Sequence, residues 1–157
     1  MLALLQSCTN NHVEYFNPKK VDSLIWGNYA GMAYPHFSLV FKYSQQKLFV
    51  DTSDAFYHKG ASRDPSKFIW VNLPKPDTMK IHQLIRLIPS EFFSKDTTFG
   101  HPDNCDQGGT FVIVYQEGKM TKYDIDNFKK QVPENIAPLS HRINELDGDF
   151  SEKYKVK

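Results

Sequence analysis

Several features that would define a function class are missing from this chain of 157 residues. No stretch approaches the roughly 20 consecutive apolar residues of a membrane-spanning helix. The two cysteines form no CxxC pair, so a thiolate zinc site or a thioredoxin-type motif has no support. Lys and Arg total 19 against 18 Asp and Glu, and they are scattered along the chain. This balance leaves no basic footprint, so nucleic acid is not an expected partner.

Catalytic and cofactor signatures are also missing. The six histidines include no HxH or HExxH spacing, and no glycine-rich loop of the phosphate-binding kind is present. Asp124 and Asp126 alternate at the end of an expected strand, where turn formation explains them. Paired carboxylates for glycosidase chemistry are therefore not evident, and no cofactor is indicated.

The composition points to a sheet-rich core. Hydrophobic residues make up 40% of the chain and aromatic residues 14%, with twelve Phe and eight Tyr. Aromatic side chains favour strands because they pack well on a pleated surface. The length fits one domain with enough residues to bury a core.

Alternation and turn residues predict two hairpins. Residues 36–43 place apolar side chains at every second position, and a second strand follows at 47–52 after a short polar turn. Residues 110–115 are almost purely β-forming, and 120–125 form their partner strand. Gly118 supplies the positive φ that the intervening turn requires.

Two further apolar runs predict single strands. Residues 24–27 are a short strand or an irregular segment. Residues 67–73 contain a continuous apolar run, which is consistent with a strand buried on both faces. Pro74 and Pro76 end that strand.

Helical spacing identifies two helices. Asp77 is an expected N-cap, and Pro89 ends the first helix. Its apolar stripe consists of Ile81, Leu84, Ile85 and Ile88. Pro138 suits the first turn of the second helix. The stripe of that helix consists of Ile136, Leu139, Ile143 and Leu146.

These elements predict an α+β fold, with an antiparallel sheet of about five strands and two helices packed on one face. We expect a single domain over residues 23–150. Residues 151–157 are a charged tail that we expect to fray.

The N-terminus carries the string Leu4-Leu5-Gln6-Ser7-Cys8, followed by polar residues. This string resembles the cleavage box of bacterial lipoproteins, although Gln6 and the short apolar stretch before it depart from the usual pattern. The resemblance implies that Cys8 is acylated and that residues 1–22 are a remnant signal and tether. The protein would then be lipid-anchored to a membrane of the bacterial cell envelope.

Two alternatives remain open for this region. The first concerns Cys8, which would be incidental in a cytoplasmic protein. The second concerns residues 9–22, which would form a loop that packs onto the domain through Tyr15 and Phe16 in place of a tether. A lipidated Cys8 cannot pair with Cys105. An unmodified Cys8 allows a disulfide to Cys105 in an oxidising compartment.

The only dense polar constellation runs from His101 to Gly109. One interpretation makes Cys105 a nucleophile, with His101 and Asp106 as further candidate catalytic residues. A second interpretation is a calcium loop, whose oxygens would come from Asp103, Asn104 and Asp106. A third is a transition-metal site built on His101, Cys105 and a distant histidine such as His58, His82 or His141. The sequence favours a fourth, a structured loop whose Asp and Asn bond their own backbone.

The preferred function is a non-catalytic envelope lipoprotein that binds a protein partner, in an inhibitor or immunity-type role. The layout of residues 36–146 faintly resembles small metalloprotease inhibitors of the emfourin type, in the order of elements only. Exposed aromatics are common binding anchors. The candidates in expected loops are Tyr29, Tyr34, Phe56 and Tyr57. The alternative function is a small hydrolase centred on Cys105 and His101.

Overall fold

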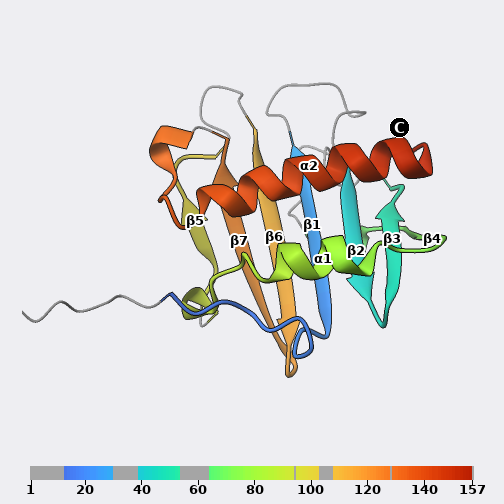
Figure 1. The fold of residues 1–157 in the computed structure, drawn as a ribbon, viewed down its shortest axis with the longest axis horizontal. Coiled ribbons are helices and arrows are strands. Elements are labelled where there is room, and N and C mark those ends of the chain that lie inside the picture. Colours follow the sequence, from blue (N-terminus) through green and yellow to red (C-terminus); the bar gives the residue numbers. More distant parts are fainter. Residues whose placement is uncertain are drawn as a thin grey trace, which may run out of the picture.

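The computed structural model describes residues 13–29, 39–53, 64–93, 95–102, 108–127 and 129–156. Two helices cover one face of a seven-stranded sheet within these ranges (Figure 1). The strands are β1 (Ser23–Tyr29), β2 (Val40–Ser44), β3 (Lys47–Asp51), β4 (Trp70–Leu73), β5 (Thr97–Phe99), β6 (Gly109–Gln116) and β7 (Lys119–Asp126). The helices are α1 (Thr78–Ile85) and α2 (Ala137–Tyr154).

The strand order across the sheet is β4-β3-β2-β1-β6-β7-β5. All neighbours are antiparallel except β5, which runs parallel to β7. The predicted α+β class is therefore confirmed, but about five antiparallel strands is wrong in number and direction. The missed strand β5 has only three residues inside a polar stretch, and Phe99 is its one buried side chain.

The central strand is β1, which the sequence marked only as a short or irregular segment. It pairs with β2 on one side and with β6 on the other. Leu24 and Trp26 face the helices, while Ile25 packs on the second face, and all three are buried. A strand that is covered on both faces needs apolar residues at successive positions, which explains why Leu24, Ile25 and Trp26 do not alternate with polar residues.

Both helices begin where the sequence predicted. The carboxylate of Asp77 accepts the Lys80 N–H at 3.2 Å and caps α1, which ends at Ile85 rather than at Pro89. Helix α2 has Pro138 in its first turn and continues to Tyr154, into the segment predicted to fray. It continues because the Tyr154 ring packs edge-on against the buried Phe150 at 5.6 Å and the Tyr154 hydroxyl donates to the Lys75 carbonyl.

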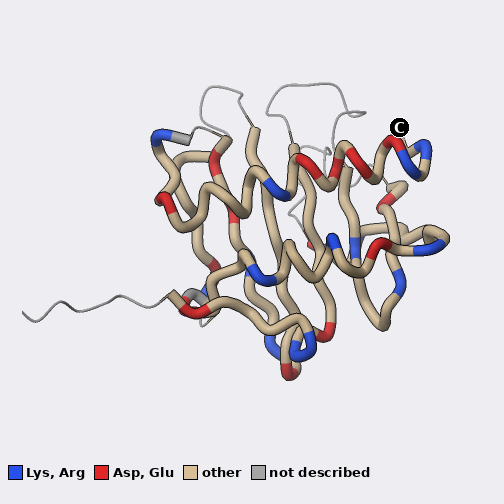
Figure 2. The backbone as a smooth tube through the Cα atoms, in the orientation of Figure 1, with Lys and Arg blue, Asp and Glu red and all other residues tan. Residues whose placement is uncertain are grey.

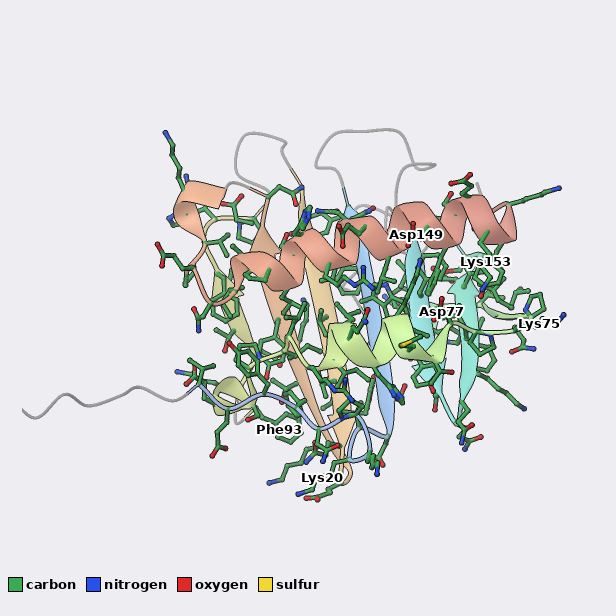
Figure 3. All side chains as sticks on the ribbon, in the orientation of Figure 1. Lys20, Lys75, Asp77, Phe93, Asp149 and Lys153 are labelled. Carbon is green, nitrogen blue, oxygen red and sulfur yellow. The ribbon has the colours of Figure 1, made fainter. Side chains whose placement is uncertain are left out.

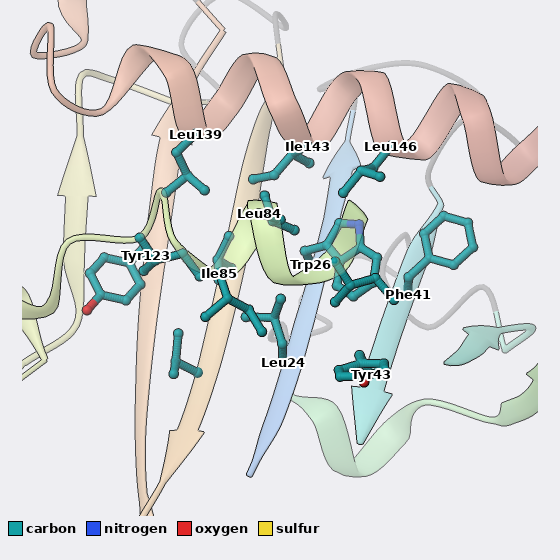
Figure 4. Packing of buried hydrophobic residues seen from close by; sticks show 14 of the residues in the cluster. Leu24, Trp26, Phe41, Tyr43, Leu84, Ile85, Tyr123, Leu139, Ile143 and Leu146 are labelled. Atoms are coloured by element: carbon teal, nitrogen blue, oxygen red, sulfur yellow. The ribbon is translucent and has the colours of Figure 1, made fainter. Parts of the chain in front are cut away.

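The main core lies between the helices and the sheet (Figure 4). Trp26 lies at its centre, stacked on Phe41 with ring centroids 5.7 Å apart. Leu84 of α1 and Ile143 and Leu146 of α2 cover the sheet from the same side. A second, smaller cluster lies on the opposite face, formed by Ile25, Tyr29, Val40, Phe68, Phe111 and Ile113.

Residues 13–22 lie against the domain, which is the second of the two alternatives for this region. Phe16 is 4% exposed, and its ring meets Phe93 edge-on at 5.1 Å. The Phe16 N–H donates to the Ile88 carbonyl at 3.0 Å, and Tyr15 forms an isolated bridge with Pro89. No helix among the described residues is long and apolar enough to cross a membrane.

Candidate functional site

The described part of the predicted loop site is held by Asp126, the last residue of β7. Its carboxylate accepts the His101 N–H at 2.9 Å, and Asp126 is only 3% exposed. Gly100 precedes this contact with φ of 76°, and a Cβ there would lie 2.6 Å from the Asp126 Cβ. The sequence assigned Asp126 to turn formation, whereas its carboxylate anchors the loop. The His101 residue itself is exposed.

The other members of the predicted site lie outside the described residues. These are Cys105, Asp106 and the candidate calcium ligands Asp103 and Asn104. The candidate lipidation site, Cys8, also lies outside the described residues. Of the predicted site, the described residues therefore show one contact at this end of the sheet, between the His101 amide and Asp126.

The described histidines have ordinary structural partners. The His82 ring meets Tyr43 edge-on at 6.1 Å, and His141 Nε2 lies 3.3 Å from Glu145. Within the described ranges, no group of three or more His, Cys, Asp or Glu could hold a metal ion. A cavity of about 70 Å³ lies beside His141, with Asp126 and Ser140 in its wall. It has room for a few water molecules but not for a substrate.

Among the described residues, Asp147 of α2 is the most deeply buried carboxyl group, at 1% exposure. Its Oδ1 accepts the indole N–H of Trp26 at 3.1 Å, and Oδ2 has no hydrogen-bond partner in the described part of the chain. Burial raises the pKa of Asp147 well above its ordinary value, although the bonds from Trp26 and from the Asn28 backbone lower it. The position between helix and sheet indicates a structural role.

The outer edge of the sheet at β4 exposes two large apolar side chains. We use the term β4 edge for Ile69, Trp70, Val71 and Asn72. Ile69 is 61% exposed and Val71 is 47% exposed. The sequence predicted this run to be buried on both faces. That prediction is wrong, because among the described strands β4 pairs with β3 alone and ends the sheet.

The backbone of the β4 edge is half paired. Thr52 N–H donates to the Ile69 carbonyl at 3.0 Å, and the Ile69 N–H donates to the Asp51 carboxylate at 2.8 Å, so both backbone groups of Ile69 face β3 and the residue that follows it. Bonded pairs recur at every second residue of an antiparallel ladder, which makes Val71 and Val50 the next bonded pair. The N–H and C=O groups of Trp70 and Asn72 consequently point away from the sheet.

Exposed lysines lie at both ends of the β4 edge. Lys67 precedes it, Lys75 follows it, and Lys47 opens the neighbouring strand β3. Elsewhere the basic and acidic residues are spread over both layers (Figure 2). Figure 3 shows Lys75 at the end of the molecule beyond α1, with Lys153 of α2 close by. The Lys75 carbonyl accepts the Tyr154 hydroxyl at 3.1 Å and Lys153 Nζ at 3.3 Å, which fixes this flank.

A groove of about 1140 Å³ adjoins the β4 edge. It opens at the end of the sheet that carries the β2–β3 and β6–β7 turns, and its walls include Trp70, Lys42 and Tyr115. Lys42 Nζ lies 5.4 Å from the centroid of the Trp70 ring, a cation–π distance. Burial, and to a lesser extent the charge of Asp64, raises the pKa of Tyr115, which keeps its hydroxyl as a donor. Because Trp70 belongs to both features, edge and groove form one surface.

Sequence reasoning missed the β4 edge, although a signal was present. Pro74, Pro76 and flanking lysines are the devices by which natural sheets protect an edge from uncontrolled pairing. No family model matches the chain, and no curated protein matches it.

Proposed function

We propose that this chain is a non-catalytic domain that binds a protein partner at the β4 edge. The exposure of Ile69 and Val71 beside backbone groups that face away from β3 is the observation that carries the proposal. An open edge with apolar side chains is an aggregation hazard unless a partner covers it. We propose further that Cys8 carries the lipid that holds the domain at a membrane of the bacterial envelope. An inhibitor or immunity-type role suits a small anchored domain of this kind.

The partner-binding proposal is tested by removing the two apolar side chains. The edge variant carries Ile69→Ser and Val71→Ser together. The control variant carries Met79→Ser and Met120→Ser together, and it removes two apolar side chains, 71% and 51% exposed, that lie outside the β4 edge. Both proteins are cross-linked in envelope extracts, and captured proteins are compared with the wild type. We expect one captured partner to be lost from the edge variant and kept by the control. Equal capture by the two variants would refute the proposal.

The anchor is tested separately. Mass spectrometry of the mature N-terminus, from protein expressed at its native locus, should find acylated Cys8 as the first residue. An intact Met1 would refute the anchor and leave the binding proposal unaffected.

A further inference from the structure

We infer that β4 receives an extended segment of the partner as an additional strand, and that this segment carries acidic residues on either side of its paired residues. The inference rests on the proposed partner-binding function and states the chemistry of the partner. Three features of the β4 edge support it: its backbone, its side chains and its charge.

The backbone argument concerns the outward groups of Trp70 and Asn72. Each residue directs an N–H and a C=O away from β3, and the two residues are spaced as an antiparallel or parallel strand requires. Strand addition satisfies such groups with main-chain bonds, and alternate side-chain contacts then supply specificity. Pro74 cannot donate a backbone bond, so pairing ends there.

The side-chain argument concerns the two faces of the added strand. Ile69 and Val71 lie on the helix side, with Leu73 of the same row buried in the main core. Trp70 lies on the second face, where Phe68 meets it edge-on at 5.3 Å. An added strand would therefore contact an apolar row on one face and an aromatic side chain on the other, which favours alternating apolar residues in the segment.

The charge argument concerns the ends of the β4 edge. Lys67, Lys75 and Lys47 are exposed, and none of them forms an ion pair with another described residue. The carboxylates nearest to the edge in the sequence already accept backbone N–H bonds: these are Asp51, Asp64 and Asp77. The charge of Asp64 attracts Lys67, with no direct ion pair between the two. Carboxylates on the incoming segment would complement the three ammonium groups further, and they would sit just outside the paired residues.

The same lysines disfavour a second copy of this chain as the occupant. A symmetric antiparallel pair that uses both outward residues places Trp70 opposite Asn72 of the second copy. That register brings Lys67 toward Lys75 of the second copy, and the contact occurs at both ends. Both lysines lie just outside the residues that would pair, and their like charges repel each other. An acidic segment avoids this repulsion.

The test uses synthetic peptides with the full chain. One peptide alternates valine and threonine between a pair of glutamates at each end, and its control has lysines in place of the glutamates. Binding is followed by fluorescence anisotropy, and amide hydrogen exchange is measured by NMR. We expect the glutamate peptide to bind about tenfold more tightly at low salt. The difference should shrink in about 1 M NaCl, where the Debye length is roughly 3 Å. Binding should slow exchange at the Trp70 and Asn72 amides.

Two variants make the test specific. In Lys67→Glu with Lys75→Glu, the preference should reverse toward the lysine peptide. In Asn72→Pro, the outward N–H is removed while the β3–β4 ladder keeps its bonds, since proline is tolerated on an edge whose N–H faces solvent. We expect Asn72→Pro to lose the peptide and, in envelope extracts, the captured partner. Peptide binding that survives Asn72→Pro, or that does not depend on peptide charge, would overturn the inference.

Other outcomes separate this inference from the proposed function. If the variant with Ile69→Ser and Val71→Ser loses the captured partner while Asn72→Pro keeps it, strand addition is refuted and partner binding stays supported. Amide exchange at Trp70 and Asn72 is also measured without peptide at several protein concentrations. If this exchange slows as the protein concentration rises, a second copy occupies the edge, and the inference is overturned.

Discussion

Replacing Asp147 with Asn should remove a pH dependence of the free energy of unfolding. Asp147 is 1% exposed, and the indole N–H of Trp26 donates to its carboxylate. Burial raises its pKa in the folded state well above the ordinary value of an aspartate. The folded protein therefore holds a proton that the unfolded chain has released over the range between the two pKa values. An Asn side chain keeps an acceptor for Trp26 but does not ionise.

The sign follows from the direction of the shift. A group whose folded pKa is raised contributes stability that is fully present below about pH 4 and is lost as the pH rises toward the folded pKa. Within that window one proton changes the unfolding equilibrium constant by about tenfold per pH unit. Over the part of this window that lies below the folded pKa, the wild type should lose about 1.4 kcal/mol per pH unit relative to Asp147→Asn. The unpartnered amide N–H of Asn adds a constant offset, which does not affect the slope.

The assay is urea denaturation of both proteins at a series of pH values, followed by tryptophan fluorescence. The difference between the two free energies isolates Asp147, because the other titrating groups are common to both proteins. Asp149→Asn is the matched control on the same helix. The hydrogen bond from Lys80 lowers the pKa of Asp149, so any contribution of this exposed group to the free energy of unfolding is lost as the pH falls. Its pH dependence therefore has the opposite sign to that of Asp147. A difference between wild type and Asp147→Asn that stays constant with pH would refute the reasoning.

Three further predictions test other parts of the structure. Gly100→Ala should lower the free energy of unfolding, measured by thermal denaturation, by at least 1 kcal/mol more than Gly118→Ala does. Both glycines have positive φ, but only a Cβ at Gly100 would meet Asp126. Equal losses would contradict this packing. Phe16→Ala should cost about 3 kcal/mol or more in urea denaturation, and a change near zero would show that residues 13–22 do not pack on the domain. Cys105→Ser should leave capture of the partner from envelope extracts unchanged, and loss of capture would favour the Cys105-centred alternative.

Local patterns predicted the elements whose determinants are close in sequence. The β6–β7 hairpin has Gly118 at φ of 75° in its turn, as the strand–turn–strand pattern indicated. The β2–β3 hairpin turns through Gln45 and Gln46, which both adopt positive φ without being glycine. Helix α1 begins at the Asp77 cap and buries the stripe that helical spacing identified.

The candidate site depended on contacts that no local pattern encodes. An apolar run such as 67–73 shows that side chains can be buried, but not whether a strand lies on each side of it. Asp126 holds the amide of His101 across 25 positions of sequence, and Trp26 reaches Asp147 across 121. Pairings of that separation arise only when the sheet assembles.

The sequence by itself determined the α+β class, the two hairpins and the starts of both helices, because side-chain periodicity, caps and turn residues act within a few positions. Only the tertiary structure decided that β1 is central, that β5 pairs in parallel with β7, and that β4 is an edge. It also decided that Asp147 is buried. Strand order, and with it the exposure of Ile69 and Val71, is set by which distant segments lie side by side.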